Sequence, residues 1–380
     1  METSQPKIPE EERHENPDIV ERKAEVLAEQ IRRSRHFIVF TGAGISTSAG
    51  IADFRGPKGV WTLRAQGREH AIESGDTLQA IPTATHMALV ELQNRGILKY
   101  LVSQNCDGLH SRSGILPDRI SELHGNSNLE YCKDCGKQYL RDFRAVAPDD
   151  KPATYHQTGR KCAICAGTLL DTIINFGEFL PEKPLKLARQ HAKKADLCLV
   201  LGSSLTVPPA CEIPETVGQS RKASLAICNL QDTPLDELAD TRIHARTDEL
   251  MVRVMEKLAL PIPLFVLRRR LVVKGIMGTG ARFQIKVRGV DANGTSATFL
   301  QSVKCANNRR SVRAEPFDID FRSRPDAGTE VTLELQFMGH YGEPNLHIKY
   351  MYGGQECAET VYGLEYNPIT GNWVVNQENS

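Results

Sequence analysis

The chain has 380 residues, and its 47 Lys and Arg are balanced by 47 Asp and Glu. This length predicts two or three domains, and the zero net charge gives no global electrostatic case for binding nucleic acid or a membrane surface. No apolar run is long enough to span a bilayer or to act as a secretory signal. We therefore expect a reducing compartment, in which ten cysteines bind metal or remain thiols.

The N-terminal third begins with a polar segment, residues 1–15, which we expect to be a mobile tail. Asn16 and Pro17 then predict the start of an amphipathic helix, because apolar residues recur every three or four positions up to about residue 35. Residues 37–40 are all apolar, which is typical of a buried parallel strand.

A glycine turn follows that strand and is the densest motif of the chain. Gly42 and Gly44 would let backbone approach a ligand closely, and residues 46–48 can begin a helix. A strand, a glycine turn and a helix N-terminus together predict an anion site. Gly50 lies six residues after Gly44 rather than three, so the full dinucleotide fingerprint is not kept and an ordinary turn stays open.

Further strands are predicted at residues 98–103, 171–176, 197–201 and 223–229, with a closing helix at 249–258. Alternation of strands and helices predicts an α/β fold, a Rossmann-like doubly wound parallel sheet. Ligand-reading groups in such sheets lie at the carboxyl ends of the strands. Polar or small residues follow these strands at Gln104, Asn105, Asp107, Gly177, Glu178, Gly202, Ser203, Ser204, Asn229 and Gln231.

Two C-x-x-C pairs interrupt this pattern. Cys132 and Cys135 form the first pair, Cys162 and Cys165 the second, with 26 residues between the pairs. Each pair lets one turn present two thiolates, and two pairs close a four-sulfur cage. We predict one structural Zn²⁺ in a ribbon module at about residues 127–170. A redox dithiol is the alternative.

Residues 263–380 have a different character. Strand-like alternation at residues 281–287, 329–337 and 345–351, with turn residues between, predicts a small β-rich, sandwich-like domain of unknown role. The basic cluster at residues 268–270 is expected in a linker or helix end and is too short to indicate a nuclear signal. This region has no candidate catalytic cluster.

Each polar residue has an ordinary explanation when it is considered alone. His124 could be a core histidine, Asn105 and Asp107 could cap a helix, and Arg55 could be a surface cation. Their combination on several strand ends beside a metal module predicts a site.

Several strings resemble the sirtuins, the NAD-dependent protein-lysine deacylases: GAGIS, ADFRGPKGVW, SQNCDGLHSRSG, ELHGN, INFGE and LGSSL. Within that family GPKGVW, HQTGRKC and NLQDTP resemble the class IV branch, which contains nuclear and nucleolar sirtuins. The resemblance implies a catalytic domain over residues 16–262 and excludes the C-terminal domain.

The resemblance also implies roles for individual residues. His124 matches the catalytic base, acting with Asn105 and Asp107, and Phe176, Gly177 and Glu178 match the edge that receives the substrate peptide. The residues that match NAD⁺ contacts are Gly42, Ala43, Gly44, Thr47, Asp53, Phe54, Arg55, Trp61, Gln104, Asn105, Asp107, Gly202, Ser203, Ser204, Asn229, Gln231 and Thr247.

The implied reaction is transfer of the acyl group from an acyl-lysine to ADP-ribose, with release of nicotinamide. Histone tails are the expected substrates, with association to chromatin and a nuclear location. Two alternatives stay open: protein mono-ADP-ribosyl transfer, and a chromatin-binding scaffold with weak catalysis. Hydride transfer is disfavoured by the missing third glycine.

Overall fold

The computed structural model describes residues 11–71, 75–152, 154–277, 283–306, 311–321, 323–354 and 358–378. The chain forms two compact units, each assembled from two stretches of sequence. Unit 1 comprises Met1–Ser127 and Thr172–Phe265, and unit 2 comprises Asn128–Asp171 and Val266–Ser380. The cysteine pairs therefore belong to the same unit as the C-terminal domain.

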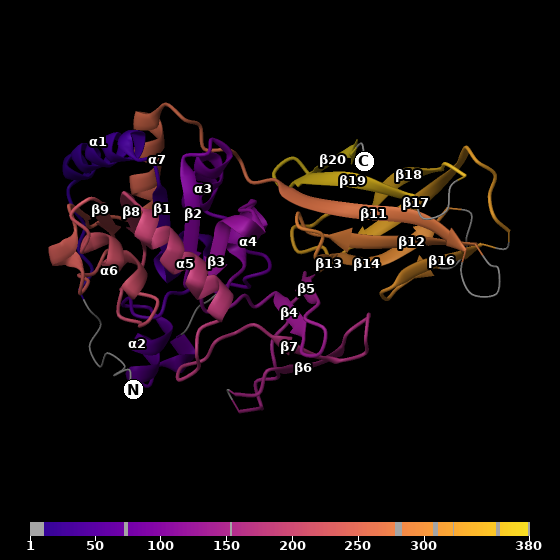
Figure 1. The fold of residues 1–380 in the computed structure, drawn as a ribbon, viewed down its shortest axis with the longest axis horizontal. Helices are drawn as coiled ribbons and strands as arrows, with labels where there is room; N and C mark the ends of the chain where they lie inside the picture. Colours follow the sequence, from indigo (N-terminus) through magenta and orange to yellow (C-terminus); the bar gives the residue numbers. More distant parts are fainter. Residues whose placement is uncertain are drawn as a thin grey trace. The chain divides into compact units, whose positions relative to one another are not determined.

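Unit 1 is built around a six-stranded parallel sheet (Figure 1). Its order is β10 (Thr241–Ile243), β9 (Ser224–Cys228), β8 (Leu197–Leu201), β1 (Phe37–Thr41), β2 (Leu98–Ser103) and β3 (Ile120–Glu122). Strands β1 and β8 are buried along their whole length, because helices cover both faces of the sheet. The predicted Rossmann-like doubly wound sheet is confirmed.

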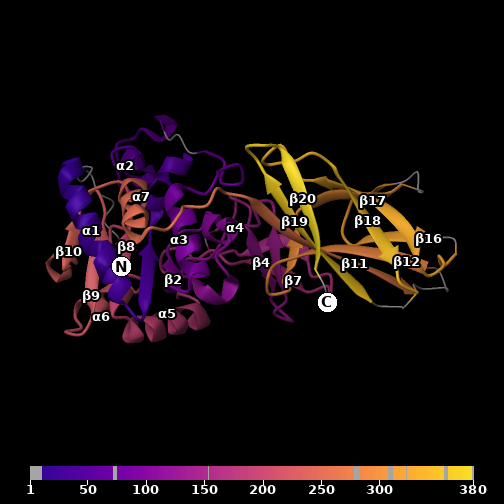
Figure 2. The same cartoon turned by 90° about the horizontal axis from the view of Figure 1, so that it is seen from above.

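Helices α1 (Pro17–Arg33), α3 (Ala84–Asn94) and α7 (Thr247–Leu258) share one core with the sheet, and α5 (Glu182–Lys194) and α6 (Glu212–Gly218) share a second core on its other face (Figure 2). The start of α1 follows its sequence signal: the side chain of Asn16 accepts from the Asp18 N–H, and Pro17 occupies the first helical position. Such a cap contributes about 1 kcal/mol.

The remaining helices of unit 1 are short: α2 (Val60–Ala65), α4 (Leu109–Ser113) and the 3₁₀ turns η1 (Ala43–Ile45), η2 (Thr47–Ala49), η3 (Glu69–Ala71), η4 (Pro117–Arg119) and η5 (Asp236–Leu238). The glycine turn after β1 thus leads into η1 and η2 and not into a regular helix. The expected helix N-terminus at residues 46–48 was wrong, because the chain reverses at Gly50, whose φ is +83°.

Unit 2 contains a β ribbon that carries the four cysteines and a two-sheet sandwich. The ribbon strands are β4 (Leu129–Cys132), β5 (Gln138–Arg141), β6 (Gln157–Lys161) and β7 (Thr168–Asp171). One sheet runs β20-β19-β11-β12-β13 and continues into β5-β4-β7-β6, with β16 paired to β12, and the other runs β15-β14-β17-β18. The two sheets share one apolar core, which confirms the predicted sandwich.

The structure describes further sandwich strands besides the three that the sequence predicted at residues 281–287, 329–337 and 345–351. The sandwich strands are β11 (Leu267–Met277), β12 (Phe283–Val290), β13 (Ser296–Thr298), β14 (Leu300–Cys305), β15 (Ser311–Val312), β16 (Phe317–Phe321), β17 (Thr329–Phe337), β18 (Leu346–Tyr352), β19 (Glu359–Asn367) and β20 (Asn372–Glu378). The basic cluster 268–270 lies inside β11, not in a linker or a helix end. Its three arginines pair with acidic side chains of Glu365, Asp142 and Glu378.

Two other expectations need correction. The strand expected at residues 171–176 does not form: β7 ends at Asp171, residues 172–175 have no regular secondary structure, and a turn follows at 176–177. The expected tail begins in residues 1–10, which lie outside the described part, but it does not extend to residue 15. The N–H groups of Arg13 and Glu15 donate to the carbonyls of Leu230 and His244, both at 2.8 Å.

Within the described ranges, no helix is long and apolar enough to cross a bilayer.

Candidate active site and metal centre

The carboxyl ends of β1, β2, β8 and β9 bring most of the predicted cofactor residues together. Ser203 Oγ, after β8, donates to Gln104 Oε1, after β2, at 2.7 Å. Gln231 Nε2, after β9, donates to the carbonyl oxygen of Arg55 at 3.2 Å. Asn229 Nδ2 donates in turn to the Gln231 carbonyl at 2.9 Å. The contacts from Ser203 to Gln104 and from Gln231 to Arg55 show that these strand ends lie close together at one edge of the sheet.

Gly42 and Gly44 lie against the backbone of the loop after β8. A Cβ on Gly42 would lie 2.7 Å from the carbonyl oxygen of Gly202, and one on Gly44 would lie 2.7 Å from Gly202 Cα. Gly44 N–H donates to that same carbonyl at 2.9 Å. The glycines therefore let the loops after β1 and β8 pack backbone against backbone, which fixes the floor of the site.

Asn105 and Asp107 are both 9% exposed and share one hydroxyl partner, Ser46. Ser46 Oγ donates to Asp107 Oδ2 at 2.7 Å and accepts from Asn105 Nδ2 at 3.4 Å. Asp107 Oδ1 also accepts from the Leu109 N–H at the start of α4, at 2.9 Å. The helix-capping explanation thus holds for Asp107 and is compatible with a place in the site, because a carboxylate accepts several hydrogen bonds.

His124 lies just after β3 and is held by the loop after β2. Its Nδ1 lies 3.0 Å from the carbonyl oxygen of Gln104, which can only accept, so Nδ1 donates and Nε2 carries the ring lone pair. The His124 carbonyl accepts from Cys106 Sγ and from the Ile174 N–H, both at 3.1 Å. Burial lowers the pKa of His124, and the hydrogen bond to Gln104 opposes that shift in part. The ring is therefore a neutral base near pH 7.

The segment after Gly50 forms an aromatic and cationic wall. The guanidinium carbon of Arg55 lies 4.5 Å from the centre of the Trp61 ring, which is itself 4.9 Å from the Phe54 ring and 5.2 Å from the Phe176 ring. Phe54 and Phe176 are 44% and 59% exposed, so the wall offers apolar surface to a ligand. Asp53 folds this loop by accepting from the Gly56 N–H at 3.0 Å, and burial raises its pKa.

The predicted substrate edge is a tight turn and not a strand. Glu178 N–H donates to the Asn175 carbonyl at 3.1 Å, and Glu178 Oε2 accepts from the Asn175 N–H at 2.7 Å. Gly177 has a φ of +90° with open space around its Cβ position, which is a backbone conformation that glycine favours. Exposed Phe176 faces Trp61 and so lies next to the predicted cofactor wall.

The other predicted cofactor residues have mainly local contacts. Ala43 lies in η1, Thr47 Oγ1 donates to the Gly44 carbonyl at 3.1 Å, and Ser204 Oγ is 3.0 Å from Thr206 Oγ1. Thr247 is the buried first residue of α7.

The four cysteines converge as predicted. The Sγ atoms of Cys132, Cys135, Cys162 and Cys165 all lie within 4.8 Å of one another. Cys132 and Cys165 are 3.5 Å apart and Cys135 and Cys162 are 3.7 Å apart, too long for disulfides. A tetrahedral zinc with bonds of about 2.3 Å needs sulfur atoms about 3.8 Å apart, so the cage fits one Zn²⁺ and leaves no open position.

Comparison with known proteins identifies the family. A sequence profile described as the Sir2 family matches residues 69–209. The NAD-dependent protein deacetylase SRT1 of Arabidopsis thaliana is 39% identical over 345 residues, which cover 83% of this chain and 72% of the plant protein. The chain belongs to the Sir2 family.

Other sirtuins match about two thirds of this chain. Human NAD-dependent protein deacetylase sirtuin-7 is 42% identical over 265 residues, covering 67% of this chain and 64% of that protein. Drosophila melanogaster NAD-dependent protein deacetylase Sirt6 is 37% identical over 258 residues, covering 66% of this chain and 80% of that protein. This sirtuin thus spans less than two thirds of the human protein's length.

A solved Sir2 structure, described with a deacetylated p53 peptide and 3′-O-acetyl ADP-ribose, is similar in fold to this sirtuin. It is 32% identical, has a TM-score of 0.50 and covers 62% of this chain and 98% of its own. The donor set at the strand ends fits the ADP-ribose group that this ligand shares with NAD⁺, because amides, hydroxyls and one guanidinium converge beside an apolar wall. NAD⁺ and zinc, both predicted from the sequence, are therefore supported.

Sequence reasoning missed the buried histidine pair His86 and His110, whose rings are 4.7 Å apart. His110 Nε2 bonds Thr41 Oγ1 at 2.9 Å, and His86 Nδ1 bonds Thr83 Oγ1 at 2.8 Å. Burial lowers the pKa of each to about 3. The spacing Thr-x-x-His at residues 83–86, a variant of the capping box, was a readable signal for His86.

Asp248 was also missed. Its Oδ1 accepts from the Thr85 N–H at 2.8 Å, and its Oδ2 accepts from Ser48 Oγ at 2.5 Å. This carboxylate ties η2 to the starts of α3 and α7, and so positions the turn that follows the glycines.

Proposed function

We propose that this sirtuin deacylates lysine side chains of histone tails, in the nucleus and in association with chromatin. The class of reaction follows from family membership: the chain is an NAD-dependent protein-lysine deacylase that acts on acyl-lysine peptides. The similarity to sirtuin-7 and Sirt6, together with the class IV motifs, supports the histone substrate and the nuclear location.

The observation that carries the catalytic assignment is the orientation of His124. Its Nδ1 is committed to the Gln104 carbonyl, and its pKa is lowered, so Nε2 can accept a proton at neutral pH. NAD⁺, when bound, would supply the electrophilic C1′ carbon, from which the acyl oxygen of the substrate can displace nicotinamide. In the proposed role, His124 removes a proton from a ribose hydroxyl.

In this proposal, the residues around His124 bind and orient NAD⁺. Gln104, Asn105 and Asp107 present amide and carboxylate groups from one loop, and their positions are fixed by Ser203 and Ser46. Fixed dipoles of this kind stabilise positive charge that develops on a ribose without having to reorganise.

The wall formed by Phe54, Arg55, Trp61 and Phe176 has two proposed tasks. Arg55, held over Trp61, provides a cation for the pyrophosphate, and the three aromatic rings exclude water from the reacting bond. Phe176 belongs to the segment that resembles the peptide-binding edge. We propose that the substrate backbone pairs with residues beside Gly177 in an extended conformation.

The test is incubation of the full chain with NAD⁺ and an acetylated histone H3-tail peptide. Nicotinamide and the peptide mass are followed together. We expect loss of the acetyl mass in step with nicotinamide release and formation of O-acetyl-ADP-ribose. A non-histone acetyl-lysine peptide of similar charge serves as the matched substrate control.

Other outcomes separate the alternatives. Label transferred from NAD⁺ to protein, without loss of acetyl, would support mono-ADP-ribosyl transfer. Retained histone binding without any turnover would support a scaffold. Equal turnover of both peptides would support the deacylase activity but contradict the proposed preference for histone tails.

A further inference from the structure

The zinc ribbon and the C-terminal sandwich of unit 2 share one continuous sheet. Strand β5 of the ribbon pairs in parallel with β13 of the sandwich, with Tyr139 opposite Ser296 and Arg141 opposite Thr298. The Asp142 N–H extends this ladder by donating to the Thr298 carbonyl at 2.8 Å. Without β13, β5 would be an edge strand with unpaired backbone groups.

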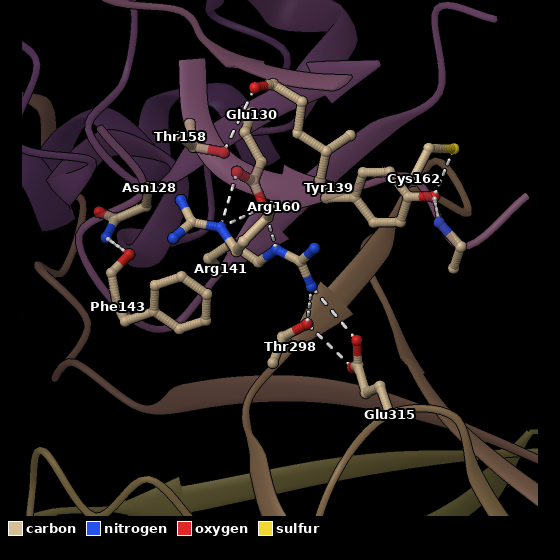
Figure 3. Close-up of polar contacts among 12 residues, drawn as sticks. Asn128, Glu130, Tyr139, Arg141, Phe143, Thr158, Arg160, Cys162, Thr298 and Glu315 are labelled. Atoms are coloured by element: carbon tan, nitrogen blue, oxygen red, sulfur yellow. Dashed lines mark hydrogen bonds and ion pairs between the residues drawn. The ribbon is translucent and has the colours of Figure 1, made fainter. Parts of the chain in front are cut away.

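A partly buried charge cluster lies across this pairing (Figure 3). Glu130 of β4 has a fully buried side chain and accepts from Arg141 Nε at 2.7 Å and from Arg160 Nε at 2.9 Å. The Arg141 side chain, 9% exposed, reaches beyond the ribbon: its Nη1 donates to Glu315 Oε2 at 3.2 Å and to the Thr298 hydroxyl. Thr298 Oγ1 also donates to Glu315 Oε1 at 2.9 Å.

The positive and negative charges of this cluster are equal in number only when residues of both the zinc ribbon and the sandwich are counted. The ribbon contributes two arginines, Arg141 and Arg160, but only one carboxylate, Glu130. The sandwich contributes the second carboxylate, Glu315. A ribbon alone would leave the largely buried guanidinium of Arg141 without this second carboxylate, which is costly in a protein interior.

A second ion pair joins the same parts. Arg269 Nη2 of β11 donates to both Asp142 oxygens at 2.9 Å, and each side chain is 13% exposed. His340 Nε2 lies 2.5 Å from the Asp142 carbonyl oxygen, and Leu140 packs against the sandwich core. The residues next to Arg141 on both sides are thus held by the C-terminal domain.

The same short strand reaches the metal cage. The Tyr139 side chain is buried, and its hydroxyl lies 3.1 Å from Cys162 Sγ and accepts from the Ala163 N–H at 3.1 Å. The guanidinium of Arg141 lies 4.7 Å from the centre of the Tyr139 ring. Strand β5 therefore contacts a zinc thiolate through residue 139 and the sandwich through residue 141.

We propose that the C-terminal sandwich is an integral partner of the zinc ribbon. It supplies the neighbouring strand β13 and the carboxylate Glu315, and thereby keeps β5 and the Cys162 side of the cage in place. The role of residues 266–378 is then to retain the structural zinc, independently of which substrate the sirtuin deacylates.

The test measures zinc release from the purified full chain with the chelating dye 4-(2-pyridylazo)resorcinol. The variant Arg269→Gln/Glu315→Gln removes both sandwich partners without touching a ribbon residue. We expect zinc release to be about tenfold faster than in the parent chain. This acceleration corresponds to a smaller change in free energy than the loss of one partner of a buried ion pair usually causes.

The matched control is Arg268→Gln/Glu359→Gln. It makes the same change of charge and removes ion pairs that hold sandwich strands to one another: Arg268–Glu365, Lys274–Glu359 and Arg288–Glu359. We expect parent-like zinc release from it. Equal release rates for the test variant and the parent, or equal acceleration in the test and control variants, would overturn the proposal.

A charge exchange distinguishes the ion pair from general damage to the sandwich. Arg269→Asp should accelerate zinc release, and adding Asp142→Arg should restore it toward the parent rate, because the pair is then rebuilt in reverse. Failure of the second substitution to slow release in the Arg269→Asp chain would contradict the assigned contact.

Discussion

The Nδ1 of His124 is bonded to the backbone carbonyl of Gln104 at 3.0 Å, and this one contact fixes the tautomer of the proposed base. Substituting His124→Tyr should reduce formation of O-acetyl-ADP-ribose by about 10²–10⁴-fold, the usual contribution of a general base. The exposed His70 provides the control His70→Gln, which should leave the rate unchanged. Zinc content and melting temperature should match the parent in both variants, and undiminished turnover of His124→Tyr would refute the assignment.

The pH dependence of kcat/KM should reflect the protonation of His124. Burial lowers the pKa of His124, so its neutral, proton-accepting form persists below the ordinary value of 6.5. We expect activity to be constant near pH 7 and to fall only as the pH drops below about 6.5. An acid limb with its midpoint above pH 7 would mean that a different group limits the reaction.

The hydroxyl of Ser46 holds the buried carboxylate of Asp107. Replacing Ser46→Ala leaves that carboxylate one donor short, which should lower the free energy of unfolding by about 1–3 kcal/mol and raise the KM for NAD⁺. Ser48→Ala, at an exposed position in the same turn, is the matched control and should change both less. Denaturant titration and initial rates at varied NAD⁺ concentration measure the two effects.

The metal cage should hold one zinc ion per chain, and atomic absorption measures this content. Cys132→Ala removes a buried ligand and should release the metal and unfold the ribbon, because structural zinc contributes folding free energy directly. Cys211→Ala, which removes a thiol outside the cage, should keep full zinc content. A parent chain without zinc would exclude the four-cysteine assignment.

The buried pair His86 and His110 should make unit 1 sensitive to acid. The folded-state pKa of each is about 3, below the ordinary value of 6.5, so the unfolded chain binds more protons between these values. Stability should therefore fall as the pH drops from about 6.5, by about 1.4 kcal/mol per pH unit for each histidine that stays neutral when folded. Urea midpoints from pH 7 to 4 measure this slope. It should be shallower in His110→Gln and unchanged in His70→Gln.

The sequence predicted the sheet of unit 1 closely, since fully apolar strands such as Leu197–Leu201 and polar strand ends are strong local signals. It could not show what Gly42 and Gly44 contact, because their neighbour Gly202 is far away in the chain. A glycine signals a crowded backbone but does not identify the group that crowds it.

The C-terminal half shows a different limit of sequence reasoning. Strand β11 carries three consecutive arginines, which conceal its alternation, and each is neutralised by an acidic residue from a distant segment. Similarly, the apolar run after Asp171 predicted a strand, yet residues 172–175 have no regular secondary structure. Gly125 explains this in part, because a Cβ there would lie 1.9 Å from the Thr172 carbonyl oxygen and the two segments must cross closely.

The shared sheet of unit 2 also sets an order of events during synthesis. Strand β5 leaves the ribosome about 160 residues before its partner β13, which corresponds to a delay of about 8–30 s at typical rates of translation. During that interval the nascent ribbon exposes an open edge and an unbalanced arginine pair. We expect unit 1 to fold once its last strand and helix have been synthesised. Unit 2 can fold completely only near the end of translation. Premature termination would therefore leave the metal module without its partner strand, even though all four cysteines had been made.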